Sequence, residues 1–439
     1  MSTGFILVAF VIVIVLMILA IAKFNVNAVT ALLIAAIILG ILIGTPLGDL
    51  EGILNSGFSG TIKSVAIIIF LGSLLGKILE ETGAAQQITY WLLGIVGEKN
   101  ATIAVGIAAF ILGIPIFSDT VTILLIPIVS NIAVTTGISM MELGTALAVC
   151  AQITHCAVVP TPGPVAGAAL LGVPFGTAIL WGLVVSIPAL ICSLIWAKTM
   201  CKEKVLPQEQ YLNKENKENL PPTGMALLPI WLPLALIVCA NFIEAVMPDS
   251  AIANIMSFVG CPTAALITGC ILAMILTGEK WKTKEVLNDW PAVAMKDAAM
   301  PLFVTGMGGC IAQLIKNADV ATSLAEIIVG AGIPGLMLPI VLSVLIHVVT
   351  GSSTLAVSTT GALVAPMLET LGVSNTAAFL AVCAGAMMFK HGNSSAFWVG
   401  CSLSNMSFPQ GLKGIGGGCT VGSIAMCVTT FILAAVGII

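Results

Sequence analysis

The residues with the most evident chemistry lie in four short polar interruptions of apolar segments, at 116–120, 154–164, 350–354 and 390–395. They carry hydroxyl groups, an aspartate, a lysine and two of the three histidines, and the third, His347, lies one turn before the third interruption. Polar backbone groups inside a membrane cost several kcal/mol each unless protein, solute or water satisfies them. These four interruptions, called the polar breaks below, therefore predict a site for a polar solute.

The candidate substrate-binding residues are the hydroxyl, ionisable, amide and glycine residues in or beside these breaks. They are Ser118, Asp119, Thr120, Thr154, His155, Thr161, Gly163, His347, Gly351, Ser352, Ser353, Thr354, Lys390, His391, Asn393, Ser394 and Ser395. Asp119, His155 and His391 are also the candidates for carrying a coupling proton. Burial disfavours the charged form of a carboxylic acid, and imidazole titrates near neutral pH. The Ser-Asp-Thr run at 118–120 equally suits a helix cap, and the two roles are compatible.

The other breaks also have two readings each. Lys390 inside a bilayer would pair with an acid or bind an anion, whereas near an interface its ammonium would extend to water. The run 351–354 has amides and hydroxyls that can surround a carboxylate, although small residues also let helices pack closely. The Pro-Gly-Pro run at 162–164 cannot continue a helix and leaves backbone groups for other partners. His347 reads equally well as a packing residue.

Composition places these breaks inside a membrane. Charged residues make up 8% of the 439 residues, hydrophobic residues 59%, and the mean hydropathy is +1.14, whereas a soluble domain carries about 25% charged residues. The sequence therefore predicts an all-α polytopic membrane protein. Its twelve cysteines form no CxxC pair and are expected to be small buried hydrophobes. The apolar run at 5–22 has no basic stretch before it, so we expect a retained first helix rather than a cleaved signal.

Segments of spanning length predict about ten crossings and two re-entrant hairpins, arranged as two five-helix halves. Each half is expected to contain scaffold helices followed by a hairpin and a broken helix. The hydrophilic linker between the halves is expected to lack a fold of its own. The predicted parts are a first half at 1–197 (scaffold 1–99, hairpin and broken helix 101–175), a linker at 198–224 and a second half at 225–439 (scaffold 225–317, hairpin and broken helix 325–412).

Two observations predict that the halves are inverted repeats. The tetrapeptide Ala-Val-Cys-Ala occurs at 148–151 and again at 381–384, each time after a short turn and before a break that contains a histidine. If both hairpins enter and leave on one side, the halves are inverted, and of the lysines only Lys63 and Lys316 clearly lie on the side of the N-terminus. This is the positive-inside pattern. It predicts both termini outside a bacterial-type plasma (inner) membrane.

An inverted repeat with broken helices at the membrane midplane is typical of secondary transporters. The sequence has no P-loop motif, so an ion gradient or the solute itself is expected to supply the energy. No cofactor is expected beyond a coupling ion, which is a proton or sodium. The expected partners are a small organic anion and the lipid bilayer, and no nucleic acid.

Several short motifs along nearly the whole chain carry a family resemblance. They are GFSGT at 57–61, LLGKILEETG at 74–83, GIPIF at 113–117, LLIP at 124–127, TH at 154–155, PGP at 162–164, GSST at 351–354, and His391 through Asn393 to Phe397-Trp398. Together they resemble the gluconate:proton symporter family of the ion transporter superfamily. The resemblance implies proton-coupled uptake of a sugar acid or another small hydroxy acid. It also implies a scaffold and a transport domain, a homodimer and an elevator-like motion.

The chain departs from the pattern of that family at several site positions. The Phe-Glu pair of the family is Ser-Asp at 118–119, and its histidine before Pro-Gly-Pro is Thr161. Its arginine before the Gly-Ser-x-Thr run is His347, its aspartate in the last break is Ser394, and Lys390 is added just before that break. Because the chain has no arginine, a bidentate Arg–carboxylate clamp cannot form. A smaller or less hydroxylated acid is thus an alternative to gluconate.

The leading hypothesis is a secondary active transporter that takes up a small organic acid, such as gluconate or a smaller relative, by proton symport. A sodium-coupled carboxylate symporter is the nearest alternative, because hydroxyls, Asn393 and freed carbonyls can coordinate sodium. A cation/proton antiporter that exchanges protons on Asp119 is another, although a single acid among hydroxyl-rich breaks argues against it. An intramembrane enzyme using His155 and His391 is disfavoured, because no H-E-x-x-H ligand set occurs.

Overall fold

The computed structural model describes residues 3–24, 26–212, 220–248, 250–317, 334–392 and 394–439, and their regular structure is entirely helical. Three sequence predictions fall wholly or partly outside these ranges. They are Asn393, the first part of the second hairpin (325–333) and the segment 213–219 of the linker. The all-helical prediction is confirmed for the part of the chain that is described.

The helices of the first half precede the linker. They are α1 (Thr3–Phe24), α2 (Ala28–Leu42), α3 (Leu47–Glu81), α4 (Ala84–Val96), α5 (Ala101–Leu112), α6 (Ser118–Thr136), α7 (Met140–Ala157), α8 (Pro162–Leu170) and α9 (Phe175–Met200), with a 3-10 turn at Glu98–Asn100. A further 3-10 turn, Glu209–Tyr211, lies within the linker.

The helices of the second half follow the linker. They are α10 (Thr223–Val246), α11 (Ala251–Val259), α12 (Pro262–Ile275), α13 (Trp290–Asn317), α15 (Met337–Thr350), α16 (Ser353–Val364), α17 (Leu368–Leu371), α18 (Asn375–Gly385), α19 (Ser395–Leu403), α20 (Phe408–Gly411) and α21 (Gly417–Ala435). Short 3-10 turns occupy Gly278–Lys282 and Ala365–Met367, and π-helical turns occupy Glu285–Asp289 and Leu412–Gly416.

The described residues contain eight helices that are long and apolar enough to cross a membrane, or nine if α11 and α12, bent by 60° at their junction, form one span. The sequence predicted about ten crossings. The difference arises because several predicted elements are too short for this test. α2 and α18, which lie in predicted crossings, are apolar helices of 10–17 residues, as are α5 and α15 in the predicted hairpins. The fifteen residues of α2 reach about 22 Å, less than the hydrocarbon core of about 30 Å. The re-entrant nature of the hairpins stays a prediction.

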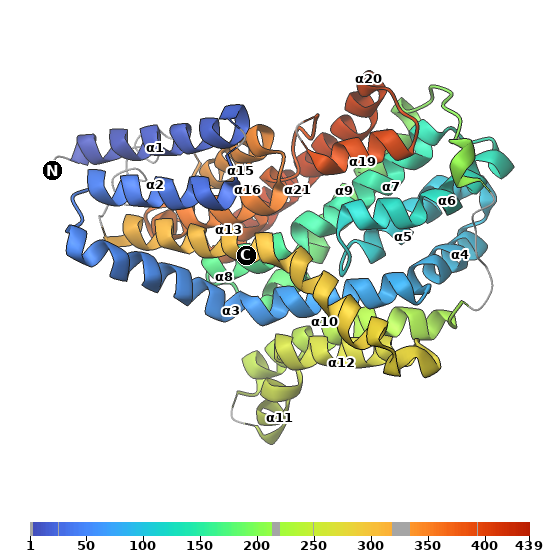
Figure 1. Cartoon of the computed structure of the whole chain (residues 1–439), viewed down its shortest axis with the longest axis horizontal. Coiled ribbons are helices and arrows are strands. Elements are labelled where there is room, and N and C mark those ends of the chain that lie inside the picture. The colour runs from blue at the N-terminus through green and yellow to red at the C-terminus, as the bar shows by residue number, and fades with distance from the viewer. Residues whose placement is uncertain (1–2, 25, 213–219, 249, 318–333, 393) are drawn as a thin grey trace.

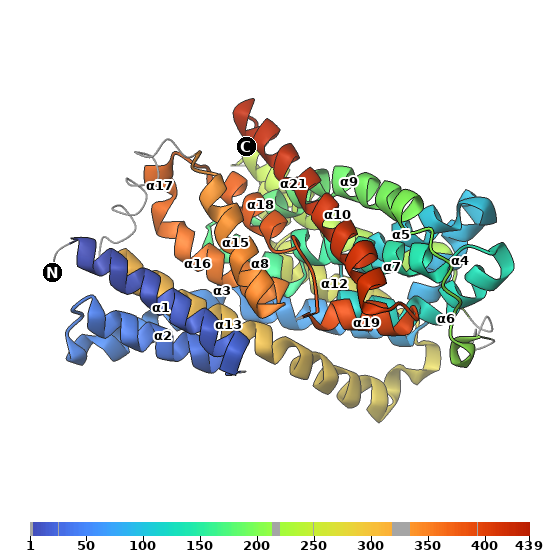
Figure 2. The same cartoon turned by 90° about the horizontal axis from the view of Figure 1, so that it is seen from above.

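The helices of the two halves interleave. Figure 1 shows α1, α2, α13 and α3 layered over one another at one end of the molecule, and the successive layers are in contact. Figure 2 places α4 and α6 at the opposite end. α9 packs along α21, and α3 packs along α13. The order α5–α6–α7–α8–α9 in the first half parallels α15–α16–α18–α19–α21 in the second. This order is what the predicted repeat requires, and the inversion of the halves stays a prediction.

The four polar breaks are the gaps between helices of these two series. α5 ends before Pro115 and α6 begins at Ser118. α7 and α8 are separated at 158–161, and Pro162 at the first position of α8 suits a helix start. Gly351 ends α15 in the left-handed conformation with φ of 71°, which glycine adopts without strain. The chain from α18 to α19 is irregular around Lys390. The sequence therefore located the breaks correctly.

The close contact of α3 with α13 depends on glycine. A Cβ atom on Gly57 would lie 2.5 Å from the carbonyl oxygen of Gly309, and a Cβ on Gly309 would clash with Gly57 and Thr61 in return. Membrane helices use such small residues to bring their backbones together, because the surrounding lipid provides no hydrophobic drive for association.

We predict that Gly57→Ala destabilises the protein by about 1–3 kcal/mol, because the added methyl group overpacks the helix contact. Gly60 is the matched control, since a Cβ there meets no atom within 4 Å. Gly60→Ala is expected to leave stability unchanged or raise it slightly. Thermal unfolding in detergent measures both. Equal melting temperatures for the two variants would contradict this account of the α3–α13 contact.

Candidate functional site

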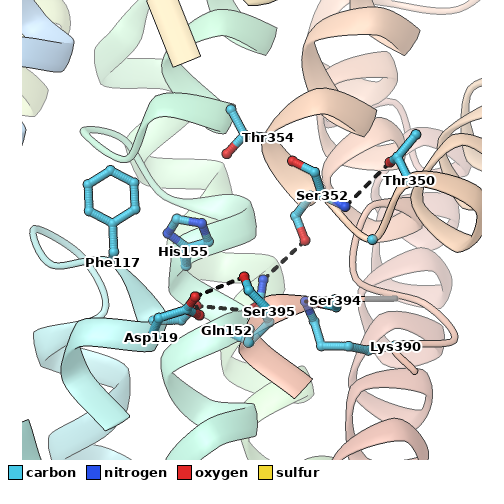
Figure 3. Close-up of a pocket in the computed structure, with 14 residues that line it drawn as sticks. Phe117, Asp119, Gln152, His155, Thr350, Ser352, Thr354, Lys390, Ser394 and Ser395 are labelled. Atoms are coloured by element: carbon cyan, nitrogen blue, oxygen red, sulfur yellow. Dashed lines mark hydrogen bonds between the residues drawn. The ribbon is translucent and has the colours of Figure 1, made fainter. Parts of the chain in front are cut away.

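A cavity of about 370 Å³ lies where three of the four polar breaks meet, and the fourth supplies only His155 from its edge (Figure 3). Its lining comes from α6, α7, the turn before α16 and the segment that leads into α19. The lining residues are Phe117, Ser118, Asp119, Gln152, His155, Thr350, Gly351, Ser352, Ser353, Thr354, Lys390, Ser394, Ser395 and Ala396. Residues of both halves therefore share one polar cavity.

Asp119 lies in the first turn of α6, two residues after the N-cap residue Phe117. Its Oδ2 accepts a hydrogen bond of 3.0 Å from Ser395 Oγ, and its Oδ1 lies 3.4 Å from Ser118 Oγ. A helix N-terminus carries partial positive charge and favours a carboxylate there. The site aspartate is thus held by its own helix and by a hydroxyl from the other half of the chain.

Gln152 occupies the centre of the cavity wall and was not among the predicted site residues. Its side chain is buried, and it accepts a hydrogen bond of 2.9 Å from Ser118 and donates one of 3.1 Å to Ser353. Its Nε2 also lies 2.9 Å from the sulfur of Cys156. The available signal was a neutral amide one turn before His155 in an otherwise apolar helix, and this signal is weak.

His155 is nearly buried, and its ring lies beside that of Phe117, with 5.6 Å between the ring centroids. Its Nδ1 is buried and has no hydrogen-bond partner among the described residues. Such a group requires a partner, because an unsatisfied buried polar atom costs about 1–3 kcal/mol. The position of this ring on the cavity wall makes a solute or water the available partner (Figure 3).

The turn at 350–354 begins a helix at the cavity. Ser352 is the N-cap of α16, and its hydroxyl accepts a hydrogen bond of 3.2 Å from the amide of Leu355. Thr350 Oγ1 accepts the amide of Ser352 at 3.3 Å. α6, α16 and α19 all begin at residues that line the cavity. Three helix N-termini therefore face one cavity and favour a negatively charged occupant.

Lys390 is the only lysine of the cavity lining and is only 3% exposed. Its Nζ donates a hydrogen bond of 3.1 Å to Ser394 Oγ, and no carboxylate of the described residues lies within ion-pair distance. Figure 3 shows Asp119 and Lys390 approaching the cavity from opposite sides. A buried ammonium without a counter-ion is costly, so an anion in the cavity would compensate its charge.

Several predicted site residues lie behind the lining instead of within it. Thr154 donates a hydrogen bond of 2.8 Å to the carbonyl of Phe110. Thr161 donates one of 2.6 Å to the carbonyl of Val158. Gly163 packs on the first turn of α16, where a Cβ would lie 3.3 Å from the Cα of Thr354. These residues therefore form hydrogen bonds and packing contacts within the breaks, outside the cavity lining.

The two other histidines also lie outside the cavity lining. His391 Nε2 lies 3.0 Å from the carbonyl oxygen of Val348, and its side chain lines a neighbouring cavity. His347 is buried, and its Nδ1 has no hydrogen-bond partner within the described part of the chain. Thr120 is half-buried on α6 and does not line the cavity. Besides Gln152, the lining residues that were not predicted are Phe117, Thr350 and Ala396.

The comparisons with known proteins identify the family. A model of the GntP family permeases matches residues 5–436. The chain is 28% identical over 405 residues to the high-affinity gluconate transporter of Escherichia coli, covering 91% of this chain and 92% of that protein. It is 30% identical over 437 residues to a gluconate permease of Zymomonas mobilis, covering 97% of both. It is 26% identical over 398 residues to the L-idonate transporter of the Gnt-II system of Escherichia coli, covering 89% of this chain and 90% of that protein.

A solved structure has the same fold. The crystal structure of the YdaH transporter of Alcanivorax borkumensis aligns with a TM-score of 0.66 at 13% identity and covers 90% of both chains. The predicted family resemblance is confirmed, and these relatives are permeases and transporters. This protein is accordingly a multi-pass membrane transporter and not an enzyme, and the chain belongs to the GntP family of permeases.

Proposed function

We propose that the protein takes up a small organic acid, gluconate or a smaller hydroxy acid, by proton symport. The substrate would occupy the cavity between the polar breaks. Its volume of about 370 Å³ lies in the lower part of the range of about 300–1,000 Å³ that is usual for small-molecule sites. Relatives named for gluconate and L-idonate transport support the substrate class.

The single observation that carries this proposal is Lys390. The ammonium group is buried, has only a serine as its hydrogen-bond partner among the described side chains, and lines a cavity that three helices enter by their N-termini. Every one of these features favours a negative charge in the cavity. Lys390 would bind the substrate carboxylate in place of an arginine, which this chain does not contain.

Asp119 is the proposed carrier of the coupling proton. It is the only acidic residue of the cavity lining, and it contacts Ser395 of the second half. When the carboxylate is protonated, the cavity gains a net positive charge that attracts the substrate anion. His155, with a free buried Nδ1 and a place on the same wall, is the second candidate. His391 remains a weaker candidate because its described hydrogen bond is to a backbone carbonyl.

The proposed motion is elevator-like, with the halves related as inverted repeats and the hairpins re-entrant. The packing supports two groups of helices. α3 packs on both α12 and α13 of the predicted scaffold, and the break-containing helices pack together in the pairs α6–α19 and α8–α16. The scaffold at 1–99 and 225–317 would hold a homodimer, while 101–175 and 325–412 would carry the substrate. Both termini would lie on the outer side of the bacterial inner membrane.

A sodium-coupled symporter is the second candidate, and one observation favours it. The carboxylate of Asp119 lies within hydrogen-bonding distance of the hydroxyls of Ser118 and Ser395, so three side chains present oxygen atoms in one place. Oxygen ligands of this kind suit hard cations.

Reconstitution in proteoliposomes tests the coupling ion and the substrate class. We expect an inward proton gradient to drive accumulation of gluconate, glycerate or lactate, and a protonophore to abolish it. A sodium gradient alone should drive none. Accumulation under sodium but not protons would establish the second candidate. If no acid of the panel accumulates under either gradient, the proposed function is wrong.

Asp119→Asn tests the proton carrier. We predict at least a tenfold loss of proton-driven accumulation, while exchange of labelled for unlabelled substrate across the membrane persists, because exchange requires no net proton movement. Glu369→Gln is the matched control, since Glu369 is an exposed acid on α17 away from the cavity. Proton-driven uptake that survives intact in Asp119→Asn would exclude this role.

Lys390→Gln tests the anion site. A hydrogen bond to a charged group is worth about 1.5–3 kcal/mol, so KM should rise at least tenfold with a smaller change in the maximal rate. Lys63→Gln provides the control, because Lys63 is exposed on α3. The measurement is the concentration dependence of initial uptake. An unchanged KM would show that the anion binds elsewhere.

A further inference from the structure

The hydrogen bonds of Gln152 have a direction that bears on the substrate. A side-chain amide donates through its nitrogen and accepts through its oxygen. The oxygen of Gln152 receives the proton of Ser118, and its nitrogen donates to Ser353. The two serines belong to different halves of the chain and both line the cavity. One buried amide therefore assigns opposite hydrogen-bonding roles to two residues of the site.

The consequence for each serine follows from its single proton. The hydroxyl proton of Ser118 is donated to Gln152. The Ser118 oxygen can therefore only accept a hydrogen bond from a solute. Ser353 receives a hydrogen bond from Gln152, so its own proton is not directed at that amide and can be donated to a solute. Both donor positions of the Gln152 amide have protein partners, because its Nε2 also contacts the sulfur of Cys156, and only its oxygen can accept one further hydrogen bond.

Neighbouring residues extend the same division. Lys390 donates to Ser394, which leaves further protons on the ammonium and the proton of Ser394 available. Ser395 donates to Asp119, so both present acceptors while the carboxylate is ionised. The cavity thus has a donor side, formed by Ser353, Lys390 and Ser394, and an acceptor side, formed by Ser118, Asp119 and Ser395.

We propose that Gln152 is a positioning residue that fixes the orientation of the substrate through Ser118 and Ser353. The inference rests on the proposed function and deepens it. The carboxylate of the substrate, which only accepts hydrogen bonds, binds on the donor side, and a hydroxyl binds on the acceptor side. A dicarboxylate is rejected, because its second carboxylate would meet the oxygens of Ser118 and Ser395, whose protons are already donated to other groups.

A double-mutant cycle on uptake tests whether Gln152 acts through Ser353. The variants are Gln152→Met, Ser353→Ala and their combination, with gluconate and glycerate as probes. Each single variant is expected to raise KM about tenfold, and the combination also about tenfold, because both remove the same donor. Effects that multiply to about a hundredfold, or an unchanged KM in Gln152→Met, would overturn the inference.

The selectivity between substrates provides a second test, because it would not change if Gln152 had only a structural role. The unmodified protein is expected to prefer gluconate over glucarate, which carries a carboxylate in place of the terminal hydroxyl. In Gln152→Met this preference should fall at least fivefold, because Ser118 is released to donate to a carboxylate. A preference that is unchanged in this variant contradicts the proposed orientation.

The control is Gln87→Met. Gln87 donates a hydrogen bond of 2.8 Å to Thr223 in a part of the molecule outside the cavity lining, so KM and selectivity should stay as they are. If Gln152→Met fails to fold, Gln152→Glu keeps the size and the acceptor and enters the same cycle. Uptake of no acid by the unmodified protein refutes the proposed function itself. Normal uptake with multiplying effects refutes only the role of Gln152.

Discussion

The need to satisfy polar groups inside a membrane is the constraint on which the rest of this structure depends. A helix that stops at membrane depth leaves up to four amides or carbonyls without partners, and lipid supplies none. Here the breaks satisfy one another. Thr154 donates to the carbonyl of Phe110, and Gln152 joins Ser118 to Ser353, which lies 201 positions after Gln152 in the sequence. Hydrogen bonds between the breaks therefore hold distant parts of the chain around one cavity.

The same constraint explains the charge of the cavity. Three helices begin there, so their unpaired amides give the walls a positive potential. The carboxylate of Asp119, in the first turn of α6, offsets part of this positive potential. Lys390 adds a positive charge that no described carboxylate neutralises at ion-pair distance. Without an occupant the cavity therefore carries an unpaired ammonium, and a bound anion would remove this cost. Under the proposed function, the cost of the empty site and its affinity for an anion have one physical origin.

The sequence located the breaks because proline, glycine and clustered hydroxyls are local signals for helix ends. It also identified Asp119 and Lys390, whose charges are exceptional in apolar segments. It could not reveal Gln152, because a neutral amide in a buried helix gains its role only from partners in another part of the chain. His391 lies in a break, yet its ring bonds to the carbonyl of Val348, because the local backbone sets the direction of the side chain. The count of crossings differed because short helices such as α2 cannot be told from spans by hydropathy alone.

Coupling of an anion to a proton requires that both act on one element, and the segment 390–396 meets this requirement. Lys390 and Ser394 at its start would face the anion under the proposed function, while Ser395 donates a hydrogen bond to the carboxylate of Asp119. Under the proposed function, protonation of Asp119 weakens the hydrogen bond that it accepts from Ser395. Binding of an anion draws Lys390 toward the cavity. Both events displace the start of α19 relative to α6. A proton and an anion can thus favour the same rearrangement without touching each other, which is the thermodynamic condition for symport.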